Sequence, residues 1–323
     1  MSIKGNKKES ISSRNTSKEI TGSSFSGNKN KRHSGLLNNQ VSAGWLFLLP
    51  LIIYFIVFQL LPMALSFGIS FTEWNLRSTP TWVGFDNYKN LLFDEVMYPM
   101  FWPSLWITLK YIVFSVPGAL AISLILAAML NANVKGEGFF KTAYYIPNVT
   151  AGVAVAAMWV FLLDPQIGMV NQLLSINHSW LGSVTTALPT LAVMAIWSTL
   201  GYNVLILLSS MKSIPDELYE AATIDGANAW HRFVKITLPM IQPTIFFLIV
   251  TGLIAAFQAF DQMYLMTAGG PAGSTTTYLL SLYNHAFRYY EMGTASAMSY
   301  ILLVIILFIT WINFKFIPQK VDD

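Results

Sequence analysis

The chain has no cysteine and little charge, and both absences narrow what it can be. Without cysteine it cannot form disulfides, use a thiol nucleophile or bind a metal through sulfur. Charged residues make up 11% of its 323 residues and hydrophobic residues 54%, whereas a soluble globular domain carries roughly 25% charged residues. So few charges cannot cover a water-exposed surface, and lipid is therefore expected to be the main solvent of this chain. The net charge of +3 gives no indication of nucleic-acid binding.

Several catalytic signatures are also missing. No Gly-Lys dipeptide occurs, so the chain has no phosphate-binding loop of the G-x-x-x-x-G-K-[ST] type. The four histidines are scattered without an H-E-x-x-H pattern, and no serine lies in a G-x-S-x-G pattern. The sequence therefore predicts no catalytic residue, no metal site and no cofactor on this chain.

Six long apolar segments make up most of the sequence. A membrane helix needs about 20 apolar residues to cross a hydrocarbon core of roughly 30 Å, and backbone groups in lipid must bond internally, which favours helices. The fold class predicted is an all-α integral membrane protein with six transmembrane helices. The predicted spans are Trp45–Phe71, Leu105–Leu130, Tyr144–Leu163, Ala187–Ser210, Thr244–Met266 and Ala295–Phe316.

The first 40 residues differ in composition from the rest. They contain eight of the nineteen Lys and Arg residues, nine serines and a single aromatic residue, Phe25. This composition predicts a disordered basic tail over residues 1–40, followed by a six-span domain over residues 41–323. The apolar run after the tail is longer than the 7–15 residues of a signal-peptide core.

The distribution of basic residues predicts the orientation in the membrane. If the N-terminus is cytoplasmic, the inside segments hold fifteen Lys and Arg residues and the outside loops hold three. Cytoplasmic loops of membrane proteins carry the excess of Lys and Arg. Both termini are therefore expected in the cytoplasm.

One cytoplasmic loop, residues 211–242, is unusually long and polar. Ser213 and Asp216 resemble an N-cap pair, and Gly226 allows the left-handed turn that ends a helix. The pattern predicts a helix, a glycine turn and a second short helix over 227–235. The acidic residues favour a docking element for a partner protein over a helix resting on lipid, because lipid-bound helices are usually rich in Lys and Arg.

The loop carries a recognisable signature. Glu220-Ala221-Ala222, three residues, Gly226, nine residues, Ile236, one residue and Leu238-Pro239 resemble the EAA motif of permease subunits of binding-protein-dependent ABC importers. Stretches elsewhere are similar to the carbohydrate-uptake branch, which includes maltose, glycerol-phosphate and lactose type permeases. These stretches are Leu200-Gly201-Tyr202-Asn203, Ala259-Phe260-Asp261, Thr267-Ala268-Gly269-Gly270-Pro271 and Phe85-Asp86-Asn87-Tyr88.

The resemblance implies a fold, a function and a set of partners. The fold is that of the MetI-like permeases, and the function is translocation of a sugar or oligosaccharide across a bacterial or archaeal cytoplasmic membrane. The implied partners are a second homologous permease, two cytoplasmic ATPase subunits that bind ATP and Mg²⁺, and an extracytoplasmic sugar-binding protein. Glu220, Ala221, Ala222 and Gly226 would make the coupling helix that contacts the ATPase.

A polar group in the fifth span is expected to line the substrate path. Asp261 lies about 26 Å along this span at 1.5 Å per residue, and an ionisable residue there should face an aqueous cavity. Gln258 precedes it by three residues, on the same face if the helix is continuous, and Gln262 is expected beside them. The resemblance adds Tyr202 and Asn203 of the fourth span. An alternative is that Asp261 pairs with Arg288 or with a partner subunit.

Other interpretations remain open at the level of sequence. A six-span chain could be a secondary transporter or a permease for a non-sugar solute. Secondary transporters usually use intramembrane acids and an internal inverted repeat, and only Asp261 lies well within a span while no repeat is evident. Gly201 and Gly252 lie within spans and are expected at close helix contacts.

Overall fold

The computed structural model describes residues 32–132 and 135–316, with side chains from residue 44 onward. Most of the predicted tail, residues 1–31, lies outside the described residues, and helix α1 begins at Arg32. The chain forms two compact units that divide between Leu61 and Pro62, and each is described by itself. The first contains α1 and η1, and the second contains the loops and helices that build the candidate site.

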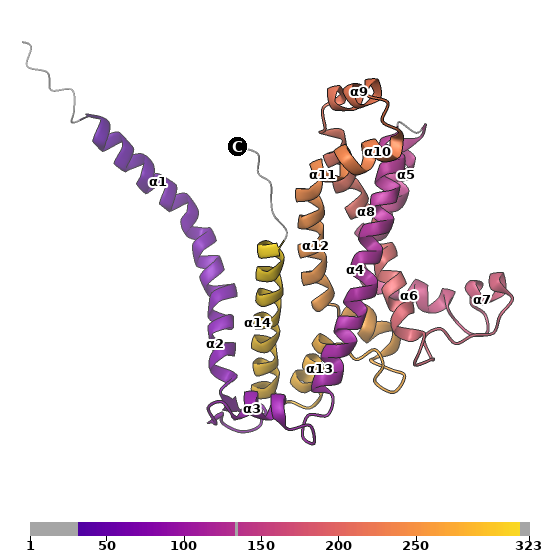
Figure 1. Cartoon of the computed structure of the whole chain (residues 1–323). Coiled ribbons are helices and arrows are strands. Elements are labelled where there is room, and N and C mark those ends of the chain that lie inside the picture. The colour runs from indigo at the N-terminus through magenta and orange to yellow at the C-terminus, as the bar shows by residue number, and fades with distance from the viewer. Residues whose placement is uncertain (1–31, 133–134, 317–323) are drawn as a thin grey trace, which may run out of the picture. The chain divides into compact units, whose positions relative to one another are not determined.

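Within the described residues, helices make up nearly all of the regular structure, as predicted (Figure 1). The α-helices are α1 (Arg32–Phe55), α2 (Leu61–Ile69), α3 (Asp86–Phe93), α4 (Phe101–Asn131), α5 (Glu137–Val149), α6 (Gly152–Leu162), α7 (Met169–Leu174), α8 (Ala187–Lys212), α9 (Asp216–Ile224), α10 (Ala229–Arg232), α11 (Leu238–Met240), α12 (Gln242–Phe257), α13 (Tyr278–Tyr283) and α14 (Met292–Phe316). Four π-helical turns are η1 (Ile56–Leu60), η2 (Phe233–Thr237), η3 (Met263–Thr267) and η4 (Asn284–Arg288). Two short antiparallel strands, β1 (Thr72–Glu73) and β2 (Thr81–Trp82), pair Thr72 with Trp82.

Four of the predicted spans are continuous apolar helices. They cover Gly44–Ile69, Phe101–Asn131, Ala187–Lys212 and Met292–Lys315, and each is long and apolar enough to cross a membrane. Two further spans are present only if two sharply bent helix pairs are each counted as one span. The described residues thus hold between four and six spans.

The prediction of one helix over Tyr144–Leu163 was wrong. The chain bends by 100° between α5 and α6, and Thr150 between them takes an extended conformation. Pro147 has no amide hydrogen and so removes one hydrogen bond from the last turn of α5. The Thr150 hydroxyl then donates to the carbonyl of Ile146 at 2.8 Å, which closes the end of the helix.

The prediction of one helix over Thr244–Met266 was also wrong. Helix α12 ends at Phe257, and η3 starts only at Met263. Gln258 and Asp261 therefore do not share a face of one continuous helix, because the break at residues 258–260 lies between α12 and the helical turn that starts at Asp261. At its N-terminal end, α12 meets the preceding helical segment at an angle of 65°.

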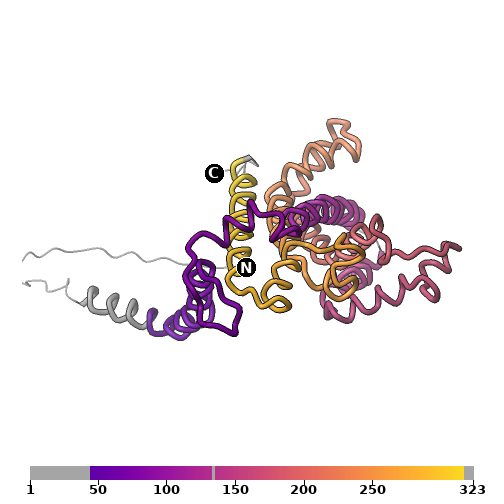
Figure 2. The backbone as a smooth tube through the Cα atoms, turned by 90° about the horizontal axis from the view of Figure 1, so that it is seen from below, coloured from indigo at the N-terminus to yellow at the C-terminus, as the bar shows by residue number. Residues whose placement is uncertain are grey.

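The second unit is built around α4 and α8, which pack along each other, with α5 against α8 and α12 against α4. Its largest hydrophobic cluster includes Tyr111, Leu191, Phe257, Met263 and Tyr278, all nearly or fully buried. A second cluster near the loop over residues 211–242 includes residues from α4, α8 and α12. Figure 2 shows α6 and α7 extending away from α4 on one side of this unit.

Candidate functional site

The loop over residues 211–242 has the predicted helix–turn–helix form, which stands at the end of the second unit away from α3 and α13 (Figure 1). Helix α9 ends at a left-handed glycine, because Gly226 has a φ of +79°. The amide of Ala227 donates to the carbonyl of Ala222 at 2.9 Å, which is the 6→1 bond of a Schellman cap. No atom lies within 4 Å of where a Cβ on Gly226 would be. Backbone conformation, and not space, therefore requires glycine here.

The N-cap predicted at Ser213 was wrong. The residue before α9 is Pro215, and it makes no side-chain cap hydrogen bond. The Ser213 hydroxyl instead donates to the carbonyl of Ser210 at 2.8 Å, at the end of α8. The helix start therefore relies on its acidic first turn, Asp216 and Glu217, which interacts favourably with the helix dipole.

Hydrogen bonds hold α9 against the segment that follows it. The Tyr219 hydroxyl lies 2.8 Å from the Thr237 hydroxyl of η2. The guanidinium of Arg232 donates to the Thr223 hydroxyl at 2.8 Å, and Thr223 itself donates to the carbonyl of Tyr219. Asn228 caps α10 by accepting from the amide of His231 at 2.8 Å. These hydrogen bonds join α9 to α10 and to η2 within the loop.

The outer surface of this loop is open. Glu220 and Ala221 are exposed and Ala222 is partly buried. Ile224 is 88% exposed and Trp230 is 70% exposed, which is unusual for large apolar side chains on a polar segment. Exposed apolar side chains beside an acidic residue are suited to contact with another protein.

An ion-pair cluster links the start of this loop to α5. The Glu137 carboxylate accepts from Lys212 at the end of α8 at 2.5 Å and from Lys141 of its own helix at 2.6 Å. Helices α5 and α8 are therefore joined at the position where the loop over residues 211–242 begins.

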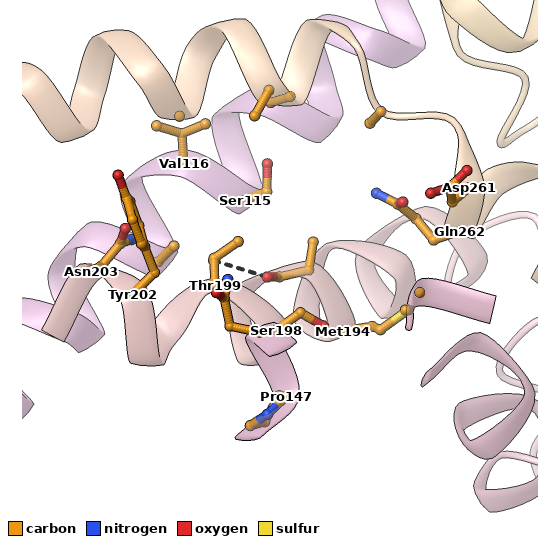
Figure 3. A pocket seen from close by; sticks show the side chains of 18 of the residues that line it. Ser115, Val116, Pro147, Met194, Ser198, Thr199, Tyr202, Asn203, Asp261 and Gln262 are labelled. Carbon is orange, nitrogen blue, oxygen red and sulfur yellow. Dashed lines mark hydrogen bonds between the residues drawn. The ribbon is translucent and has the colours of Figure 1, made fainter. Parts of the chain in front are cut away.

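A second feature is a cavity of about 620 Å³ between α4, α8, α12 and the α5–α6 break. All five residues predicted for the substrate path line it: Tyr202, Asn203, Gln258, Asp261 and Gln262. Figure 3 shows Tyr202 and Asn203 at one end and Asp261 and Gln262 at the other. They come from α8 and from the segment after α12, in which helical conformation resumes at Asp261. Sequence spacing alone could not bring these two parts of the chain together.

Sequence reasoning missed several polar residues of this cavity. They are mostly hydroxyl and amide side chains within the apolar helices, namely Tyr111, Ser115, Asn148, Thr150, Ser198, Thr199 and Thr251. Some recur at helical spacing, as Tyr111 and Ser115 do on α4, and this polar stripe is the signal that could have revealed them. The Ser198 hydroxyl is buried without a hydrogen-bond partner among the described residues.

The irregular segment beside the cavity is anchored on both sides. The Gln262 amide donates to the Tyr111 hydroxyl at 2.7 Å, and the Thr277 hydroxyl donates to the carbonyl of Ala259 at 3.1 Å. Thr277 belongs to a compact threonine-rich loop, in which Thr275 donates to the carbonyl of Gly270 at 2.8 Å. The contact from Thr277 satisfies a backbone carbonyl just after the end of α12.

The pairing considered between Asp261 and Arg288 does not form. The Arg288 guanidinium lies over the ring of Tyr264, 5.9 Å from its centroid. Asp261 is exposed in the cavity and belongs to none of the three ion pairs found in the described part of the chain.

Comparison with known proteins gives a consistent assignment. Residues 46–320 match the family described as binding-protein-dependent transport system inner membrane component. The chain is 40% identical over 281 residues to the probable ABC transporter permease protein YesP of Bacillus subtilis (strain 168), covering 84% of this chain and 89% of YesP. It is 33% identical to the multiple sugar-binding transport system permease protein MsmF of Streptococcus mutans, covering 84% and 94% of the two chains.

A solved structure supports the same fold. It is the crystal structure of a bacterial alginate ABC transporter in complex with an alginate pentasaccharide-bound periplasmic protein. One of its chains superposes with a TM-score of 0.73 at 26% identity, over 85% of this chain and 94% of that one.

Proposed function

Because this chain belongs to the binding-protein-dependent transport system inner membrane components, we propose that it forms one half of the path by which a sugar or oligosaccharide enters a bacterial cell. It is the permease subunit of an ABC importer and is not itself catalytic. It works in a complex with a binding protein and with an ATPase, which carries the nucleotide.

The polar cavity is the observation that carries the sugar assignment. Its lining offers hydroxyl, amide and carboxylate groups from Thr199, Tyr202, Asn203, Gln258 and Asp261. Sugars present many hydroxyls, and side chains of this kind both donate to and accept from hydroxyls. The relatives named for multiple sugars and for alginate support the same class of cargo.

The cytoplasmic loop supplies the coupling to the ATPase. In this proposal Glu220, Ala221, Ala222 and Gly226 dock into the ATPase, and Ile224 and Trp230 add apolar contact area. The hydrogen bonds that join α9 to η2 let a movement of the docked helix reach α12, and the Glu137–Lys212 pair passes it to α5. Both α5 and α12 end at the cavity.

The proposal includes further partners, which the resemblance to ABC importer permeases implies. A second homologous permease would complete the path, and two ATPase subunits would bind on the cytoplasmic side, one for each permease. Both termini of this chain would then be cytoplasmic. This orientation places fifteen Lys and Arg residues in the inside segments and three in the outside loops, as expected for a membrane protein.

Reconstitution tests the proposed function. The chain, its partner permease, the ATPase and the binding protein would be assembled in liposomes with ATP inside. We expect ATP-dependent uptake of a sugar that the binding protein retains. Uptake that is independent of ATP and follows an ion gradient would indicate a secondary transporter and contradict the proposal.

A further inference from the structure

The cavity between α4, α8, α12 and the α5–α6 break contains one charged side chain. Among the described residues that line it, Asp261 is the only Asp, Glu, Lys, Arg or His. Asp261 is exposed, and Figure 3 shows it beside Gln262 at one end of the cavity. The other lining residues have apolar side chains, neutral hydroxyl or amide groups, or no side chain at all. A single carboxylate therefore gives this cavity its charge.

No basic side chain in the described part of the chain forms an ion pair with this carboxylate. The Lys110 ammonium lies 5.8 Å from the centroid of the Trp106 ring, and neither of these residues lines the cavity. The Arg288 guanidinium lies over the ring of Tyr264, and Arg288 is also outside the lining. Asp261 thus presents an unpaired negative charge to any cargo in the cavity.

The apolar part of the lining strengthens the effect of that charge. Val116, Leu120, Val155 and Leu248 are among the lining residues. Two charges interact more strongly beside such low-dielectric walls than in bulk water, and a cleft that carries charge of one sign concentrates the potential. A carboxylate on the cargo would therefore be repelled on entering this cavity.

A neutral sugar meets the opposite situation. Its hydroxyls can donate to the Asp261 carboxylate, and hydrogen bonds to an ionised acceptor are stronger than those between neutral groups. Thr199, Asn203 and Gln258 add further donors and acceptors. A uronic acid differs from the matching neutral hexose only in having a carboxylate in place of a hydroxymethyl group. Charge, and not overall shape, would therefore separate the two classes of cargo.

We propose that Asp261 is a specificity-determining residue, which makes the cavity selective for neutral sugars and excludes sugars that carry carboxylates. This inference rests on the proposed function, because the cavity is taken as the sugar path. The cargo class then differs from that of the related alginate transporter, which imports an acidic polysaccharide.

Direct binding to the permease tests the inference without the selectivity of the binding protein. The complex of this chain, its partner permease and the ATPase would be placed in nanodiscs without the binding protein. Three matched pairs of trisaccharides would be titrated, with saturation-transfer NMR to detect weak binding. The pairs are galactotriose and trigalacturonate, mannotriose and trimannuronate, and cellotriose and its triglucuronate counterpart.

We expect the wild type to bind a neutral trisaccharide at least about tenfold more tightly than its acidic counterpart, because like charges brought together weaken binding strongly. Asp261→Asn keeps the size of the side chain and removes its charge, so it should reduce this ratio to about threefold or less. Glu95→Gln is the matched control. It removes one negative charge at an exposed residue outside the cavity and should leave the ratio unchanged.

The outcomes separate this inference from the proposed function. Equal or tighter binding of the acidic member of a pair by the wild type would overturn the inference alone, and would indicate that the partner permease supplies a positive charge. An unchanged ratio in folded Asp261→Asn would also overturn it. If Asp261→Asn does not fold, the wild-type ratio still decides. Failure of all six sugars to bind would contradict the proposed function together with the inference.

Discussion

Gly201 of α8 lies directly against the backbone of Tyr144 in α5. A Cβ on Gly201 would be 2.2 Å from the Tyr144 carbonyl oxygen and 2.6 Å from the Cα of Tyr145. No side chain fits at that distance, so the two helix backbones are in contact here. The close helix packing predicted for Gly201 is therefore confirmed, whereas a Cβ on Gly252 would meet only the side chain of Val116, at 3.4 Å.

We expect Gly201→Ala to destabilise the protein by about 1–3 kcal/mol, the usual cost of overpacking, because α5 must move away from α8. The thermal unfolding midpoint in detergent measures this. Gly138→Ala is the matched control, since Gly138 lies in α5 with no atom within 4 Å of its Cβ position, and alanine favours helix. Equal midpoints for the two variants would contradict the prediction.

We expect Gly226→Pro to uncouple the permease from its ATPase while the protein still inserts in the membrane. Proline fixes φ near −65°, and Gly226 needs +79°, so the end of α9 must rearrange. The ratio of sugar uptake to ATP hydrolysis in proteoliposomes checks this. Gly226→Asn should keep roughly half or more of the wild-type ratio, because asparagine tolerates the left-handed region. A wild-type ratio of uptake to ATP hydrolysis in Gly226→Pro would refute the prediction.

Glu220→Lys tests the charge at the proposed docking face. Glu220 is exposed, and its side chain has no hydrogen bond or ion pair among the residues that the structure describes. We therefore expect the fold to be unchanged and binding of the ATPase to weaken. Co-purification in detergent and the uptake rate are the measurements. The control is Glu95→Lys, which makes the same charge reversal at an exposed residue outside the loop; equal ATPase recovery with both variants and the wild type would argue against docking through Glu220.

We expect the Glu137–Lys212 pair to stabilise the folded protein through electrostatic attraction between the two side chains. We expect Glu137→Lys and Lys212→Glu each to lower the unfolding midpoint, and the combined swap to restore most of the loss. The differences should shrink in about 1 M NaCl, where the screening length falls to about 3 Å. Failure of the swap to rescue either single variant would mean that the pair does not link α5 to α8.

Deleting residues 2–31 should leave uptake nearly unchanged. The composition of this segment offers little apolar surface to bury, and helix α1 starts after it, at Arg32. The basic residues of the later loops, such as Lys141 and Lys212, still favour the same orientation. Uptake per amount of membrane-inserted protein is the measurement, and a loss at normal insertion would assign the tail a role in transport.

Apolar length predicted the continuous spans but not the interruptions. Pro117 lies within α4, which continues past it, while the sharpest bend occurs after Thr150, three residues beyond Pro147. Proline removes one hydrogen bond wherever it occurs, and packing against neighbouring helices decides whether the helix continues. That packing involves residues far apart in the chain, so a local pattern does not reveal it.

The sequence allowed several residues of the candidate site to be predicted, but it did not allow their arrangement in space to be predicted. The signature of the cytoplasmic loop and the lone acidic residue in a span identified Gly226 and Asp261. The hydroxyls of Tyr111, Ser198 and Thr199 were missed because such residues are common within membrane helices and carry no charge that marks them. Only the fold places these groups around one cavity.

The bend after α5 also affects the lipid around the protein. Helix α5 has 13 residues, which at 1.5 Å per residue extend about 20 Å, less than the roughly 30 Å of a hydrocarbon core. The chain then turns by 100° into α6. Helix α6 therefore adds to the cross-sectional area of the protein in one leaflet, and the protein occupies a smaller area in the other leaflet. We therefore expect the permease to occupy unequal areas in the two leaflets, and its transport rate to respond to lipids that change lateral pressure, such as phosphatidylethanolamine in place of phosphatidylcholine.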